Sequence, residues 1–154
     1  MKSIISKSVA LIALTLTLFS FTTNFGGEGF EISLNGKVVL QQYNKELNEV
    51  RTLNLNAAAP NDLLTIRYYH CGKVAKNRIV TIKDGQDKIL KEFRFKDASE
   101  QRGEMSCKVQ DLFGLKKSKD LVLKMYYSSS ELPNGRQIAV VSFAGSQDHA
   151  STNK

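Results

Sequence analysis

The sequence predicts an all-β protein, an antiparallel β-sandwich of about eight or nine short strands. Segments in which apolar and polar residues alternate recur at intervals of about 8–15 residues, with turn sequences between them. Several of these segments are apolar on both faces, which favours a sandwich of two packed sheets over a barrel. An immunoglobulin-like topology fits this spacing, although the chain has no Trp for the buried position that antibody domains fill with that residue.

The first 24 residues have the order of an export signal. Lys2 and Lys7 make a basic start, residues 8–21 carry no charge, and polar residues follow at 22–24. The uncharged run is shorter than the roughly 20 apolar residues that a bilayer span needs. We therefore expect a cleaved signal peptide over 1–24 and a periplasmic or secreted mature protein. The alternative is an uncleaved membrane anchor.

The remaining chain divides into a short flexible lead-in, one domain and a polar tail. The lead-in covers 25–29, the domain covers 30–144, and the tail, which we expect to be disordered, covers 145–154. The expected strands are 30–34, 37–43, 50–55, 63–71, 78–83, 88–95, 105–110, 121–127 and 136–143. One helical turn is expected within 111–119, and it is the only helix that we expect in the mature chain.

Three turn sequences join neighbouring strands into antiparallel hairpins. Asn35-Gly36 follows the first strand, and both central residues of a type I′ turn need a positive φ, which Asn and Gly accept most easily. The polar stretch 84–87 joins the two strands on either side of it. Pro133-Asn134-Gly135 is the expected turn between the last two strands.

The balance of charge predicts an anionic partner. The net charge is +7, and it falls to +5 without Lys2 and Lys7, the only charged residues of the signal. Export argues against nucleic acid and leaves anionic polysaccharide, lipid headgroups or an acidic protein. The candidate contacts are Lys73, Lys76 and Arg78 in one connection, joined by a second cluster of Lys116, Lys117 and Lys119. The alternative is a solvated basic surface without a ligand.

The segment Tyr68-Tyr69-His70-Cys71-Gly72 places a histidine beside one of the two cysteines. Because alternate side chains of a strand face opposite sides, we expect His70 to face inward and Cys71 outward, and Cys107 to face inward from its own strand. A Cys71–Cys107 disulfide is the favoured interpretation, since an even number of cysteines in an exported protein indicates pairing. The alternatives are two free thiols, or a copper or zinc site formed by His70, both cysteines and Met105.

The sequence offers few residues that could form a catalytic site. A hydrolytic triad needs a base beside a nucleophile, but His70 lies on an apolar strand face and His149 lies in the tail. Four acidic residues lie close together in the sequence: Glu92, Asp97, Glu100 and Glu104. The last three stand in a polar loop, as solvated charges do, and do not indicate a pair across a cleft. We therefore expect an exported binding or structural module without a catalytic centre, cofactor or metal. The alternative is a small envelope metal-binding protein or enzyme centred on His70 and Cys71.

Overall fold

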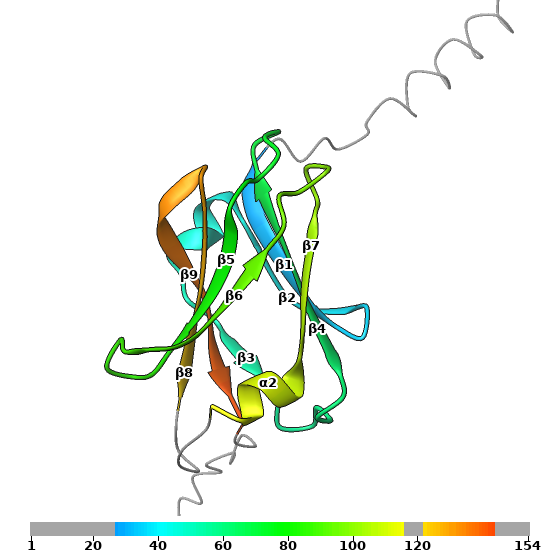
Figure 1. Cartoon of the computed structure of the whole chain (residues 1–154), viewed down its shortest axis with the longest axis vertical. Helices are drawn as coiled ribbons and strands as arrows, with labels where there is room; N and C mark the ends of the chain where they lie inside the picture. The colour runs from blue at the N-terminus through cyan, green and yellow to red at the C-terminus, as the bar shows by residue number, and fades with distance from the viewer. Residues whose placement is uncertain (1–26, 116–121, 144–154) are drawn as a thin grey trace, which may run out of the picture.

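The computed structural model describes residues 27–115 and 122–143 and shows an all-β protein, as expected. In these residues, nine strands form one sheet of four strands and one of five (Figure 1). The expected signal peptide, the expected tail and the lysine cluster at 116, 117 and 119 lie outside the described residues.

The four-stranded sheet is antiparallel throughout, in the order β2-β1-β4-β7. Its strands are β1 (Glu28–Leu34), β2 (Lys37–Tyr43), β4 (Leu63–His70) and β7 (Glu104–Lys108). Asn35 and Gly36 join β1 to β2 with φ values of 49° and 83°, as the predicted type I′ hairpin requires. β4, one of the two central strands of this sheet, carries the first three residues of the Tyr68–Gly72 segment.

The five-stranded sheet has the order β3-β9-β8-β5-β6 and contains one parallel pair. Its strands are β3 (Thr52–Asn54), β5 (Arg78–Lys83), β6 (Ile89–Phe95), β8 (Leu123–Ser129) and β9 (Leu132–Ser142). The short β3 pairs in parallel with β9, so the expectation of purely antiparallel pairing is wrong there.

The turn between β8 and β9 does not lie at residues 133–135, where the sequence predicts it. The strands are joined at Ser130 and Glu131, and the Glu131 N–H donates to Ser129 Oγ at 3.2 Å. Residues 133–135 lie inside β9, where the register shifts and Gly135 has a φ of 68°. These turn-forming residues therefore make an irregularity in the strand, because a bulge satisfies the same backbone preferences as a turn.

Two short helices flank the sheets. The α-helix α2 (Val109–Phe113) follows β7 directly and begins two residues before the expected helical turn. The 3-10 helix η1 (Asn44–Asn48) was not expected. The buried Gln42 amide donates to the carbonyls of Glu46 and Glu49, at 2.6 and 2.9 Å, and so holds η1 against β2. These contacts span only four and seven residues of the chain, but they join a side chain to the backbone, which secondary-structure propensity does not describe.

The inward faces of both sheets share one hydrophobic core. Its buried members include Phe30, Ile32, Ile66 and Tyr68 from the first sheet and Val80, Ile82, Met125 and Tyr127 from the second. The Tyr68 ring of β4 stacks on the Tyr127 ring of β8, with centroids 4.3 Å apart and planes 15° apart. The two sheets thus contact each other directly through this aromatic pair.

The two hairpin glycines offer a matched test of the backbone geometry. A Cβ at Gly36 or Gly85 would meet no atom within 4 Å, but only Gly36 has a positive φ, of 83°. We expect Gly36→Ala to lower the free energy of unfolding by about 1–2 kcal/mol, the cost of a left-handed residue with a Cβ. Gly85→Ala should leave it unchanged to within about 0.5 kcal/mol. Denaturant unfolding measures both, and equal effects would contradict the turn assignment.

Candidate functional site

The Tyr68–Gly72 segment ends β4 and turns tightly at its last two residues. Cys71 and Gly72 have φ values of 47° and 87°, and the Lys73 N–H donates to the His70 carbonyl at 3.0 Å. His70 is buried, with 7 % of its surface exposed, whereas Cys71 is exposed. The expected inward direction of His70 and outward direction of Cys71 are both confirmed.

His70 is a hydrogen-bonded member of the core. Its Nε2 lies 2.9 Å from Tyr127 Oη and 3.3 Å from Ser129 Oγ. Burial lowers its pKa, and the Lys73 charge acts in the same direction, while Glu131 and Glu28 oppose the shift. A serine beside a histidine suggests hydrolytic chemistry, but Ser129 and His70 are both buried, so no substrate reaches the hydroxyl. The imidazole is therefore positioned to join the sheets rather than to react.

The expected Cys71–Cys107 disulfide is wrong, because both cysteines are free. Cys107 faces Leu64 across the β4–β7 pair, and Cys71 lies roughly 23 Å farther along, at about 3.3 Å per residue. A disulfide needs Cα atoms within about 7 Å. Burial, with a contribution from Asp111, raises the pKa of the Cys107 thiol to about 11, so this thiol is unreactive near neutral pH.

The same separation removes the geometric basis for a metal site at His70 and the cysteines. His70 and Cys71 point to opposite sides of the strand end, and Cys107 lies toward the other end of the sheet. Among residues 27–115 and 122–143, no three His, Cys, Asp or Glu side chains gather where they could hold a metal ion.

Arg78, expected as an exposed ligand contact, is buried and fully engaged with the backbone. Its exposed fraction is 6 %, because it shares the inward face of β5 with Val80 and Ile82. Its guanidinium donates to the Lys96 carbonyl from Nε and Nη2, at 2.9 and 2.7 Å, and to the Gly103 carbonyl from Nη1, at 2.8 Å. The prediction for Arg78 is therefore wrong. The alternation along the strand contained the signal that would have placed it inside.

Three connections at this end of the molecule form one hydrogen-bonded unit, which we call the loop platform: residues 71–77, 96–103 and 130–131. Gln101 Nε2 donates to the Gly72 carbonyl, and the Ala98 N–H to the Ala75 carbonyl, both at 2.9 Å. Further bonds are Asn77 N–H to Asp97 Oδ1 at 2.8 Å, Lys76 N–H to Glu131 Oε2 at 3.0 Å, Ser130 N–H to the Lys76 carbonyl at 2.9 Å and Asn77 Nδ2 to Ser130 Oγ at 2.8 Å. Loops from both sheets are thus held rigidly together.

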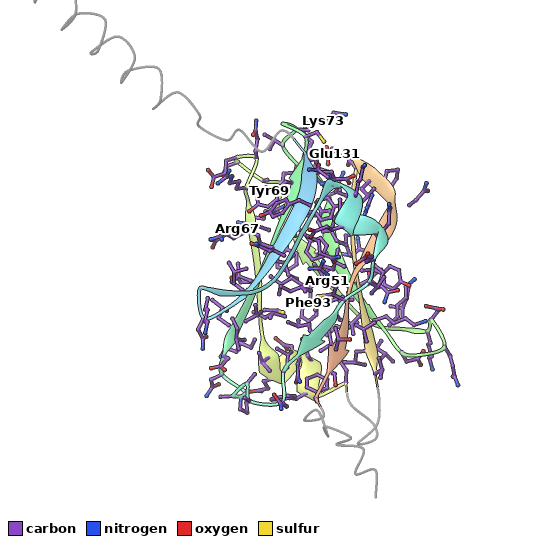
Figure 2. All side chains as sticks on the ribbon, turned by 180° about the vertical axis from the view of Figure 1, so that it is seen from behind. Arg51, Arg67, Tyr69, Lys73, Phe93 and Glu131 are labelled. Atoms are coloured by element: carbon purple, nitrogen blue, oxygen red, sulfur yellow. The ribbon has the colours of Figure 1, made fainter. Side chains whose placement is uncertain are left out.

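The loop platform carries slightly more positive than negative side chains: Lys73, Lys76, Lys96 and Arg102 against Asp97, Glu100 and Glu131. Lys73 and Lys76 are exposed, and the ion pairs of the described part of the chain include neither of them. One carboxylate oxygen of Asp97 accepts the Asn77 N–H and one of Glu131 accepts the Lys76 N–H, and Asp97 is exposed. Figure 2 shows Lys73 and Glu131 at the same end of the molecule. Of the three predicted contacts in this connection, the structure therefore leaves the two lysines accessible.

A second feature missed by the sequence analysis lies on the outer face of the four-stranded sheet. The rings of Tyr43 and Tyr69 stack there, with centroids 5.9 Å apart and planes 26° apart. Gly29 lies between them in the register, and a Cβ at this position would come within 2.2 Å of the Tyr43 ring. The glycine thus lets Tyr43 lean across β1. We call Tyr43, Tyr69, Glu31, Arg67 and Arg102 the tyrosine face.

The charges of the tyrosine face are arranged around Glu31. Tyr43 Oη donates to Glu31 Oε1 at 2.5 Å, and Arg67 Nη1 lies 3.7 Å from Glu31 Oε2. Burial and the Glu31 carboxylate raise the pKa of Tyr43 to about 12 and also raise that of Tyr69. Although burial alone would raise the pKa of Glu31, the two phenols and Arg67 lower it overall. Glu31 is therefore ionised and its charge is balanced locally.

Arg102 links the tyrosine face to the loop platform. Its guanidinium carbon lies 5.6 Å from the centre of the Tyr69 ring, as in a cation–π contact. Arg67 and Tyr69 follow one another along the outer side of β4 in Figure 2. No sequence pattern indicated this cluster, because it depends on the register of three strands.

Comparison with known proteins leaves the family open. No family model matches the sequence, and no curated protein is significantly similar to it. Neither helix within 27–115 and 122–143 has the length and apolar character needed to cross a bilayer. The loop platform and the tyrosine face are therefore the features of this chain from which a function can be inferred.

The buried His70 should make stability fall as the pH is lowered. Its folded-state pKa is below the ordinary value near 6.5, so the neutral form contributes stability above that pH and loses it as the pH falls toward the folded pKa. We expect the free energy of unfolding of the native protein to fall more steeply than that of His70→Gln below about pH 6.5, by at most about 1.4 kcal/mol per pH unit. Denaturant unfolding between pH 7.5 and 5 measures this difference. Parallel curves would show that His70 titrates as it does when unfolded.

Proposed function

We propose that the chain is an exported β-sandwich binding module without a catalytic centre, and that its loop platform holds an anionic ligand through Lys73 and Lys76. The observation that carries this proposal is the rigid hydrogen-bonded union of three loops, with both ammonium groups left exposed. Binding residues concentrate on loops that a rigid scaffold positions, and preorganised loops lose little entropy on binding.

The strand order supports an immunoglobulin-like sandwich. Consecutive strands β4 and β5 lie in different sheets, β7 returns beside β4, and β8 returns beside β5 with β9 next to it. These neighbours correspond to the B–E and C–F–G pairings of the immunoglobulin fold. The inter-sheet disulfide of antibody domains has no counterpart here, and the Tyr68–Tyr127 stack joins the equivalent two strands.

The position of the loop platform in such a sandwich favours binding. The connections that follow β4 and β8 correspond to the B–C and F–G loops, which form part of the binding end of antibody variable domains. This is an analogy of architecture and carries no ligand with it. It indicates only that the scaffold suits recognition at this end.

Three features support a role without catalysis. The imidazole of His70 is used in the core, the guanidinium of Arg78 is used by the backbone, and the thiol of Cys107 is buried. In the described part of the chain, no buried side-chain nitrogen or oxygen lacks a hydrogen-bond partner. The alternative centred on His70 and Cys71 would need their side chains to converge, and they diverge.

Export is proposed from the first 24 residues alone. The basic start, the uncharged run and the polar residues that follow are typical of a signal peptide. A periplasmic or extracellular protein would meet anionic polysaccharides, lipid headgroups and acidic proteins, which suit exposed lysines.

Paired lysine substitutions test the proposed contact. The double variant Lys73→Ala/Lys76→Ala should bind polygalacturonate and phosphatidylglycerol vesicles roughly thirtyfold more weakly, because each of the two cations contributes about 1 kcal/mol at an anionic surface. The matched control is Lys37→Ala/Lys88→Ala, which removes the same charge from exposed positions at the opposite end of the strands. Titration of the native chain and both variants at two salt concentrations measures the effect.

The outcomes separate a site from a generally basic surface. Binding that weakens with salt and depends on Lys73 and Lys76 but not on the control pair supports the proposal. If both double variants lose affinity equally, the interaction depends only on the net charge of the protein. If neutral dextran binds as tightly as polygalacturonate, the proposed specificity for anions is wrong.

A further inference from the structure

We infer that the ligand is an acidic polysaccharide whose chain runs from the loop platform across Arg102 onto the tyrosine face. This inference rests on the proposed function and names the ligand class and a second half of its binding surface. It adds Arg102, Tyr43 and Tyr69 to the proposed site. Neither their charge nor their spacing in the sequence indicates that these three residues lie together.

The two surfaces are continuous. Gln101 Nε2 bonds the Gly72 carbonyl at 2.9 Å, so the turns that carry Arg102 and Lys73 touch one another. Arg102 then lies over the Tyr69 ring, which stacks on Tyr43 across Gly29. Cationic groups and aromatic rings therefore follow one another from the loop end of the molecule onto the four-stranded sheet.

The charges along this path suit a ligand with spaced acidic groups. Arg102 is exposed, and the salt bridges found in the described part of the chain do not involve it. Glu31, the acid nearest the tyrosines, is balanced by two phenols and by Arg67, so it repels an approaching anion only weakly. Lys73 and Arg102 are thus exposed cations on the two turns that touch, and Glu100 is an exposed acid on the turn that carries Arg102.

The aromatic rings distinguish a polysaccharide from the other anionic ligands. Tyr43 and Tyr69 are half-buried on a sheet face, where the apolar C–H side of a sugar ring can pack against them by dispersion. A lipid surface would instead be contacted by apolar side chains at the loop tips. The loop platform offers little apolar surface of this kind, because Val74, at 39 %, is the one large hydrophobic residue exposed on it. A polymer that combines sugar rings with carboxylate or sulfate groups matches both halves of the surface.

The experiment compares ligands and variants on the full mature chain. The probes are polygalacturonate, which is carboxylated, heparin, which is sulfated, neutral dextran, a single-stranded oligonucleotide and phosphatidylglycerol vesicles. The variants are Arg102→Ala, Tyr43→Leu and Tyr43→Phe, with Lys37→Ala as the charge-matched control far from the site. Circular dichroism and the unfolding midpoint confirm that each variant folds, and Arg102, being exposed, should be replaced without loss of the fold.

Binding of the acidic polysaccharides should depend on the Tyr43 ring and on the Arg102 guanidinium. Arg102→Ala and Tyr43→Leu should each weaken binding to one or both acidic polysaccharides about fivefold to tenfold, in proportion to the loss of a cation or a stacking ring. Lys37→Ala, far from the site, should stay within about twofold of the native protein. Tyr43→Phe keeps the ring but removes a hydrogen-bond donor to Glu31, and it should weaken binding less than Tyr43→Leu does. Vesicle binding should not change in Tyr43→Leu.

Three results would overturn the inference in different ways. If Lys73→Ala/Lys76→Ala abolishes binding while Arg102→Ala and Tyr43→Leu do not weaken it, the tyrosine face is excluded and the proposed function stands. If the oligonucleotide or the vesicles bind more tightly than both polysaccharides and depend on the same residues, the ligand class is wrong. If none of these changes affects binding of any probe, both the proposed function and the inference fail.

Discussion

The stacked rings of Tyr68 and Tyr127 join the two sheets, and the geometry of the loop end depends on this contact. Each ring is buried and each hydroxyl has a partner: Tyr68 Oη donates to Glu28 Oε1 at 2.7 Å, and Tyr127 Oη lies 2.9 Å from His70 Nε2. Arg136 Nη2 holds the other oxygen of Glu28 at 3.3 Å. A buried tyrosine stabilises a core only when its polar end is satisfied. The stack therefore combines apolar burial with a small, complete polar network.

The loop platform is built directly on this network. β4 ends at His70 and β8 ends at Ser129, so the connections that leave both strands start beside the stack. Arg78 then fixes the third connection by binding the carbonyls of Lys96 and Gly103. A buried guanidinium with carbonyl partners is costly to disturb, because losing them would leave a charge unsatisfied in the interior. The exposed lysines therefore lie on a loop whose anchoring residues belong to both sheets.

Local patterns predicted much of the fold, and long-range pairing explains what they missed. β2 and β5 have the expected ends, and the Asn35-Gly36 hairpin formed because both residues accept positive φ. His70 was placed inward by alternation alone, whereas Arg78 was assigned to the surface by its charge against the same alternation. The disulfide failed because the β4–β7 register, which no local pattern contains, separates the cysteines. The tyrosine face likewise required Gly29 to lie between two strands.

A double-mutant cycle between Tyr68 and Tyr127 tests most directly whether the aromatic stack couples the two sheets. Tyr68→Leu, Tyr127→Leu and the double variant are compared with the native protein by denaturant unfolding at neutral pH, so that hydrogen bonds lost by each ring alone cancel in the cycle. If the stack couples the sheets, the coupling energy should be about 0.5–1.5 kcal/mol in favour of the native pair. Additive effects, with a coupling below about 0.3 kcal/mol, would show that the sheets are held together elsewhere and would contradict this role of the stack.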